Sequence, residues 1–222
     1  MKEIRNGRLI AAGQDAEPAG VVGVFETVRL WNGEPAFFDE HARRYAAGCD
    51  FFNLQAAPDA DILRQAARQL IEVNAISEGV LRWAVWRCSD SAIEWRAQAD
   101  PPRPHMRKAL WRARFAAAIV PPSDSGAAYK HLNRQLWREE LAAARAAGFD
   151  EAVFSDAKGR VVEGAISNIF LVKDGQLLTP SLSCGPLPGL ARARVLAWAA
   201  ELGIAVRETE LPVAELKKAD EL

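Results

Sequence analysis

Tyr129-Lys130-His131-Leu132-Asn133-Arg134 is a short polar string that follows a stretch rich in proline and glycine. We expect a helix to begin directly after it and to run to about Ala147, with Gly148 as its C′ residue. Lys130 would then lie near the positive end of that helix, where a cation is unfavourable. A solvated surface lysine is the plain interpretation, but the unfavourable position indicates a chemical role.

Glu163 is the second residue of interest, because it lies between Val162 and Gly164 in a strand pattern that runs from Arg160 to Phe170. One interpretation is a glutamate on an edge strand, facing water. The other is a partly buried carboxylate, which needs a cationic partner. The sequence leaves both open.

A turn at Gly185-Pro186-Leu187-Pro188-Gly189 then opens a helix that we expect to run from Leu190 to about Leu202. The free N–H groups at a helix N-terminus bind anions. An amine, a carboxylate and such a helix end are together what a protein needs to hold pyridoxal phosphate. The lysine forms a Schiff base, the acid pairs with the pyridinium nitrogen, and the helix end receives the phosphate.

Three arginines are further candidates, although each also fits an ordinary surface position. Arg44 follows Asp39-Glu40-His41 on an expected helix and could add a charged contact to the phosphate. Arg82 and Arg87 lie in the strand pattern around Trp83, and either could bind a substrate carboxylate.

The bulk composition excludes several other classes of protein. The 222 residues carry a formal net charge of −1, which gives no reason to expect nucleic acid or an anionic membrane as partner. Cys49, Cys88 and Cys184 are far apart and in no ligand spacing, so we expect neither disulfides nor a metal. No apolar run approaches the roughly 20 residues of a membrane span. The N-terminus resembles a strand and turn rather than a signal peptide, and we expect a cytoplasmic protein.

The order of strand and helix patterns predicts two domains in an α+β, or α/β, mixture. Residues 1–120 form the smaller N-terminal domain, with helices from Glu40 to about Cys49, capped by Asp39, and from Asp59 to Asn74. Residues 121–128 read as an interdomain linker. Residues 129–222 form the C-terminal domain, which would carry both Lys130 and the phosphate-binding helix.

In their order and spacing, several motifs resemble the class IV (fold type IV) pyridoxal-phosphate enzymes, which include branched-chain and D-amino-acid aminotransferases and 4-amino-4-deoxychorismate lyase. The resemblance covers most of the chain and rests on a set of ordered segments. These are Phe25–Arg29, Glu40–Arg44, Lys130–Arg134, Gly148–Ala152, Glu163-Gly164 with Ser167–Phe170, Thr179-Pro180 and Leu187–Arg192.

The resemblance implies the D-amino-acid-aminotransferase-like fold, two α/β domains with the cofactor between them, and a homodimer. It makes Lys130 the Schiff-base lysine, Glu163 the partner of the pyridine nitrogen and Arg44 a phosphate ligand. The phosphate cradle would consist of the backbone at Gly189, Leu190 and Ala191. The family continues beyond the position of Leu222 into a further phosphate-contacting loop, so we expect the C-terminal domain to be truncated.

Within the family, Lys130-His131-Leu132-Asn133-Arg134 most resembles the lyase, which releases pyruvate and 4-aminobenzoate in folate synthesis. A class IV aminotransferase acting on branched-chain or D-amino acids with 2-oxoglutarate is the first alternative, because the same lysine serves both reactions. A non-catalytic relative is the second alternative. Its basis is Ala191, which stands where the family commonly has a threonine, together with the expected truncation.

Overall fold

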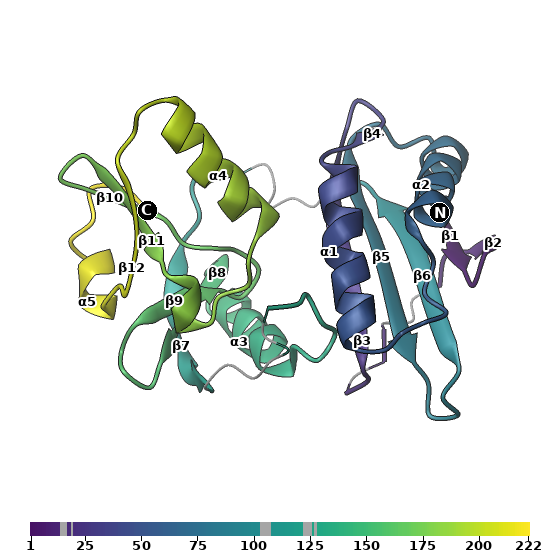
Figure 1. Cartoon of the computed structure of the whole chain (residues 1–222), viewed down its shortest axis with the longest axis horizontal. Coiled ribbons are helices and arrows are strands. Elements are labelled where there is room, and N and C mark those ends of the chain that lie inside the picture. Colours follow the sequence, from purple (N-terminus) through teal and green to yellow (C-terminus); the bar gives the residue numbers. More distant parts are fainter. Residues whose placement is uncertain (14–16, 19, 103–107, 122–125, 127) are drawn as a thin grey trace. The chain divides into compact units, whose positions relative to one another are not determined.

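The computed structural model describes residues 1–13, 17, 18, 20–102, 108–121, 126 and 128–222. Its contacts divide the chain into two compact units, whose elements are labelled in Figure 1. Unit 1 comprises Met1–Lys108 and Tyr129–Asn133, and unit 2 comprises Ala109–Ala128 and Arg134–Leu222. Most of the predicted linker, residues 121–128, lies outside the described residues. No helix in the described part of the chain is long and apolar enough to cross a membrane.

Unit 1 is a six-stranded antiparallel sheet with two helices. The strand order is β2-β1-β6-β5-β3-β4. The elements are β1 (Lys2–Arg5), β2 (Arg8–Ala11), β3 (Gly23–Trp31), β4 (Glu34–Pro35), α1 (Phe38–Phe51), α2 (Ala60–Asn74), β5 (Gly79–Arg87) and β6 (Ile93–Asp100).

The core of unit 1 lies between the two helices and one face of this sheet. α1 contacts β3, α2 contacts β1 and β6, and the helices contact each other. Since side chains alternate across a strand, Val24, Val28 and Leu30 of β3 point into this core, and each is at most 2% exposed. The same parity forces Glu26 into the core, where it is fully buried. A carboxylate in that position needs partners on the helices.

The helix boundaries were predicted well, except at the start of α1. The helix predicted from Asp59 to Asn74 is present as α2, and Asp59 is its N-cap, because its Oδ1 accepts from the Ile62 N–H at 2.9 Å. The prediction that Asp39 caps α1 was wrong: the cap is Phe37, in the left-handed region with φ 54°, and Asp39 lies in the first turn. There its carboxylate suits the positive helix end.

Unit 2 contains two three-stranded sheets, β7-β8-β9 and β10-β11-β12. In each sheet one pair of strands is parallel and is joined through a helix: β7 and β8 through α3, and β11 and β12 through α4. The elements are β7 (Ala113–Val120), α3 (Gln135–Ala146), β8 (Glu151–Asp156), β9 (Val161–Gly164), β10 (Leu171–Lys173), β11 (Gln176–Pro180), the 3₁₀ turn η2 (Leu182–Cys184), α4 (Leu190–Glu201), β12 (Val206–Thr209) and α5 (Val213–Leu216).

The contacts place the unit boundary differently from the predicted domains. Residues 109–120 group with unit 2 because β7 pairs with β8. Tyr129–Asn133 groups with unit 1 because its backbone pairs with β3, through the N–H of Phe25 to Lys130 O and the N–H of Leu132 to Gly23 O. The predicted α+β organisation is nevertheless confirmed.

Candidate active site

Lys130 lies in a short segment beside β3 and not at a helix end, and the His131 N–H donates to Tyr129 O at 2.9 Å, which closes a tight turn at Lys130. α3 begins at Gln135, so the expected position of Lys130 in the field of a helix N-terminus was wrong. The Lys130 carbonyl accepts from the Phe25 N–H at 3.0 Å, and Leu132 N–H donates to Gly23 O at 2.8 Å. A Cβ on Gly23 would lie 2.7 Å from the Leu132 side chain, so the glycine permits this close approach.

The contacts of each side chain show where the residues of this segment point. Leu132 is buried with Ala84 and Trp86 of β5, on the sheet face away from α1. Lys130 Nζ lies 4.8 Å from the centre of the Phe25 ring, which packs against the same cluster as Leu132. Tyr129 stacks on Phe51 at the end of α1, with ring centres 4.5 Å apart. The amine is therefore held by strand pairing and by anchors on both sides.

Arg44, the predicted phosphate ligand, is fixed to the buried Glu26. Its Nε and Nη2 donate to the two carboxylate oxygens, both at 2.7 Å. His41, one turn earlier on α1, places Nδ1 2.7 Å from Glu26 Oε2. Glu26 is adjacent to Phe25, whose N–H holds Lys130, so one dipeptide of β3 positions both the amine and Arg44.

Glu26 stays ionised although it is buried. Burial by itself raises the pKa of this carboxyl, but hydrogen bonds from His41 and Arg44 and the charges of these partners outweigh burial, so the pKa lies below its usual 4.5. The pair therefore presents the Arg44 guanidinium in a fixed orientation.

The two arginines of β5 lie on opposite faces of the sheet. The Arg82 guanidinium lies 4.0 Å from the centre of the Phe25 ring, the same ring that Lys130 approaches, and it pairs with Glu17 through Nε at 2.7 Å. Arg87 instead donates to the backbone carbonyls of Phe52 and Asn53, at 2.9 and 2.7 Å. Only Arg82 is brought beside Lys130.

In unit 2, Glu163 is buried at 4% exposure and accepts three hydrogen bonds. Arg134 Nη2 and Trp137 Nε1 donate to Oε1, at 2.8 and 3.1 Å. The Leu187 N–H donates to Oε2 at 2.9 Å. The interpretation of Glu163 as a solvated edge residue is therefore excluded, and the buried carboxylate has the cationic partner that it requires.

Leu187 links Glu163 to the N-terminus of α4. Its N–H is held by Glu163, and its carbonyl accepts from Asn168 Nδ2 at 2.9 Å. Two residues later, Gly189 is the N-cap of α4 and supplies no side-chain cap. A Cβ on Gly189 would lie 1.8 Å from Asn168 Oδ1, so only glycine fits here. The first-turn amides of α4, at Leu190 and Ala191, thus have no capping side chain from the residue before them.

Arg192 anchors this first turn to the sheet. Arg192 is 5% exposed, and its guanidinium donates to Pro180 O at 3.0 Å and to Glu208 at 2.5 Å. These acceptors lie at the ends of β11 and β12, so the direction of α4 is set by the parallel strands that it connects.

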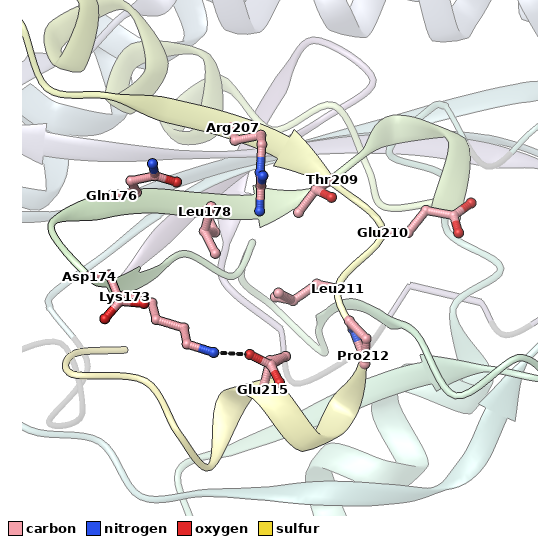
Figure 2. A pocket seen from close by; sticks show the side chains of 10 residues that line it. All are labelled: Lys173, Asp174, Gln176, Leu178, Arg207, Thr209, Glu210, Leu211, Pro212 and Glu215. Atoms are coloured by element: carbon pink, nitrogen blue, oxygen red, sulfur yellow. Dashed lines mark hydrogen bonds and ion pairs between the residues drawn. The ribbon is translucent and has the colours of Figure 1, made fainter.

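A separate open groove of about 450 Å³ lies between β10, β11, β12 and α5 (Figure 2). Lys173 and Glu215 form an ion pair on one side of it, and Arg207 extends over Leu178 on the other. None of the predicted site residues lines this groove.

The sequence did not predict the residues that form hydrogen bonds to the predicted site residues and to their neighbours. Glu26 carried a usable signal, because it occupies a core-facing position between Val24 and Val28. His41 and Arg44, three apart on one helix face, carried another. The contacts of Arg134, Trp137 and Asn168 had no signal in the chain.

Each unit, taken by itself, contains groups that suit a part of pyridoxal phosphate. Unit 2 presents a buried carboxylate beside a helix N-terminus without a side-chain cap, which suit a ring nitrogen and a phosphate. Unit 1 presents Lys130 on a segment hydrogen-bonded to β3, and an Arg44 that is paired with Glu26. These are the groups that a protein needs to hold this cofactor.

Comparison with known proteins agrees with this class of site. The family model described as Amino-transferase class IV matches residues 23–222, so the chain belongs to the class IV aminotransferase family and is an enzyme of that family. Pyridoxal phosphate is its cofactor, and a related branched-chain aminotransferase has been solved in its form with this cofactor. The suspected family, the fold and the cofactor are thus confirmed.

Three relatives illustrate the range of activities. The branched-chain-amino-acid aminotransferase of Salmonella typhimurium is 28% identical, over 90% of this chain and 71% of its own. The structure of the branched-chain aminotransferase of Thermoproteus uzoniensis with norvaline is 28% identical, with a TM-score of 0.86, over 99% of this chain and 81% of its own. That of 4-amino-4-deoxychorismate lyase from Pseudomonas aeruginosa is 27% identical, with a TM-score of 0.74, over 98% and 84%.

Proposed function

We propose that the chain is an aminotransferase that moves the amino group of an amino acid to a 2-oxo acid. The observation that carries this proposal is the similarity, over nearly the whole chain, to branched-chain aminotransferases. This reverses the preference for the lyase that the residues after Lys130 gave. Branched-chain amino acids with 2-oxoglutarate are the first substrates to test, and D-amino acids are the second.

Each predicted residue has a role in this proposal. Bound pyridoxal phosphate supplies an electron sink for the carbon that bears the amine. Lys130 would hold the cofactor through Nζ, and its amine would move the proton at that carbon, which makes it the catalytic residue. Glu163 pairs with the ring nitrogen. Arg44 and the backbone at Gly189, Leu190 and Ala191 bind the phosphate.

For the substrate carboxylate the contacts favour Arg82 over Arg87. Arg82 and Lys130 lie against one aromatic ring, so a carboxylate bound by Arg82 would bring its amine-bearing carbon near the amine of Lys130. Both oxygens of Glu17 accept from Arg82, at 2.7 and 2.9 Å, so a substrate carboxylate would take the place of Glu17 there. Arg87 instead donates to two backbone carbonyls on the other face of the sheet, where Lys130 does not lie.

The proposal is tested first by covalent attachment of the cofactor. The purified protein with pyridoxal phosphate should show a visible absorption band, and borohydride reduction followed by peptide mass spectrometry should locate the label on Lys130. Lys130→Ala should lose the band, whereas Lys158→Ala, in the turn before β9, should keep it. Glutamate production from leucine, isoleucine or valine with 2-oxoglutarate then tests the reaction. A labelled protein that transfers no amino group from branched-chain or D-amino acids would contradict the proposal.

4-Amino-4-deoxychorismate lyase is the second candidate, because Lys130-His131-Leu132-Asn133-Arg134 resembles the lyase and a lyase is among the solved relatives. Release of pyruvate from aminodeoxychorismate, measured with lactate dehydrogenase, distinguishes it from the aminotransferase. The non-catalytic relative, the second alternative from the sequence, is not proposed, because the chain belongs to a family of enzymes. The homodimer and the cytoplasmic location stay predictions, and sedimentation equilibrium would test the first.

A further inference from the structure

Arg134 and Trp137, at the start of α3, converge on a single oxygen of Glu163. Arg134 Nη2 lies 2.8 Å and Trp137 Nε1 3.1 Å from Oε1. The guanidinium also lies 4.6 Å from the centre of the Trp137 ring, which orients it. The Arg134 and Glu163 side chains are 12% and 5% exposed, so this ion pair is poorly screened by solvent.

The hydrogen bonds leave one acceptor position on the carboxylate. Each oxygen of a carboxylate accepts about two hydrogen bonds. Arg134 and Trp137 use both positions on Oε1, and Leu187 N–H uses one on Oε2. A ring nitrogen paired with Glu163 therefore meets Oε2, on the same oxygen that Leu187 holds.

A carboxylate beside a pyridine nitrogen raises the affinity of that nitrogen for a proton, and a nearby cation lowers it. Resting on the proposed function, we propose that Arg134 is a positioning residue that holds Glu163 by Oε1 and lowers the proton affinity of the cofactor ring nitrogen. The ring nitrogen then faces an ion pair with no net charge instead of a lone carboxylate. The cofactor ring is therefore a weaker electron sink than it would be beside Glu163 without Arg134.

The other acidic group beside this strand is already balanced by the backbone. Glu151 Oε2 lies 2.8 Å from where a Cβ on Gly164 would stand, and Glu151 accepts from the N–H groups of Ala152, Ala165 and Ile166 and from Ser167 Oγ. Among the charged contacts that reach Glu163 itself, Arg134 is the cation to test.

The test measures protonation of the ring nitrogen directly. Protein loaded with pyridoxal phosphate that is ¹⁵N-labelled in the ring is titrated with pH, and the nitrogen shift is followed by NMR. Arg134→Gln removes the charge but keeps a side chain that can donate to Oε1. We expect the titration midpoint to rise by about one pH unit, a tenfold gain in proton affinity. Arg134→Met provides a second uncharged variant should the first fail to fold.

Two controls separate charge from structure. Arg134→Lys keeps the charge, and its midpoint should stay near that of the unmodified protein. Trp137→Phe removes a neutral donor from the same oxygen while keeping the ring near Phe154, and it should move the midpoint much less than Arg134→Gln. An unchanged midpoint in both uncharged variants, or an equal shift in Trp137→Phe, would overturn the proposal.

Failure of this inference differs from failure of the proposed function. A protein that never forms the coloured complex would contradict the proposed function. A coloured protein in which the titration midpoint of the ring nitrogen does not change when Arg134 is replaced would contradict the inference alone.

Discussion

Glu26 is the buried residue on which the geometry of unit 1 depends most. Its carboxylate has three hydrogen bonds to α1, two of them from Arg44. Glu26→Gln would leave the Arg44 guanidinium, 13% exposed, without its counter-charge. We expect this to cost about 3 kcal/mol of unfolding free energy, because one partner of a buried pair is removed. Urea unfolding at neutral pH measures it.

A matched control is Glu78→Gln, since Glu78 pairs with Arg29 at 36% exposure on both sides. An exposed pair contributes at most about 1 kcal/mol, so this variant should stay near the parent protein. Equal losses in the two variants would show that burial of the Glu26 pair carries no special weight.

The lowered pKa of Glu26 also predicts how stability depends on pH. Because the folded pKa lies below the usual 4.5, the contribution of Glu26 is complete above pH 4.5 and is lost as pH falls through the lowered value. The free energy of unfolding of the parent should therefore fall below pH 4.5 more steeply than that of Glu26→Gln. Urea titrations at a series of pH values measure both slopes, and parallel slopes would contradict this assignment.

At the scale of elements, the start of α4 depends on the close approach of Gly189 to Asn168. In Gly189→Ala the new Cβ would displace the Asn168 amide and break its bond to Leu187 O. We expect a loss of about 1–3 kcal/mol from this overpacking, and weaker binding of pyridoxal phosphate. Thermal unfolding and cofactor titration measure the two effects.

A double-mutant cycle supplies the control for Gly189. In Asn168→Ala the obstacle is absent, so adding Gly189→Ala should cost less than it does in the parent protein, with a coupling of about 1 kcal/mol. Strict additivity of the two substitutions would refute the proposed clash.

Local sequence patterns predicted most of the helices. They did not predict the backbone pairing between segments that are far apart in the sequence. The extent of α2, from about Asp59 to Asn74, and the end of α3 at Gly148, whose φ is +81°, were predicted from neighbouring residues. The addition of Tyr129–Asn133 to β3 joins segments more than a hundred residues apart, and no local period encodes it. The predicted roles of Lys130 and Glu163 came from the order of motifs, whereas the bond from Arg134 to Glu163 required the fold.

For the whole molecule, the separation of the hydrophobic cores predicts separable unfolding. Two clusters lie in unit 1, a large one that includes Leu70 and Trp83 and a small one around Trp86, and two others, which include Phe154 and Leu171, lie in unit 2. Leu70→Ala, at a fully buried position, should cost about 2–5 kcal/mol in unit 1. Peptide-resolved hydrogen exchange should show faster opening of α2 and β5, with unit 2 unchanged.

Phe154→Leu is the reciprocal variant, because Phe154 is fully buried in unit 2. It should speed exchange in β8 and α3 and leave unit 1 unchanged. If either substitution accelerates exchange in both units equally, the two cores unfold as one cooperative structure.

The two hydrogen bonds of the Leu187 backbone determine where this chain tolerates insertions and deletions. Its N–H and its carbonyl are both taken by side chains of the strand region around Glu163 and Asn168, and Gly189 follows only two residues later. Residues inserted between Ser181 and Pro186 would enlarge a turn and leave this spacing intact. A single residue inserted between Leu187 and Gly189 would move the whole of α4 away from Glu163. Natural insertions and deletions should therefore accumulate before Leu187 and be rare between Leu187 and Gly189.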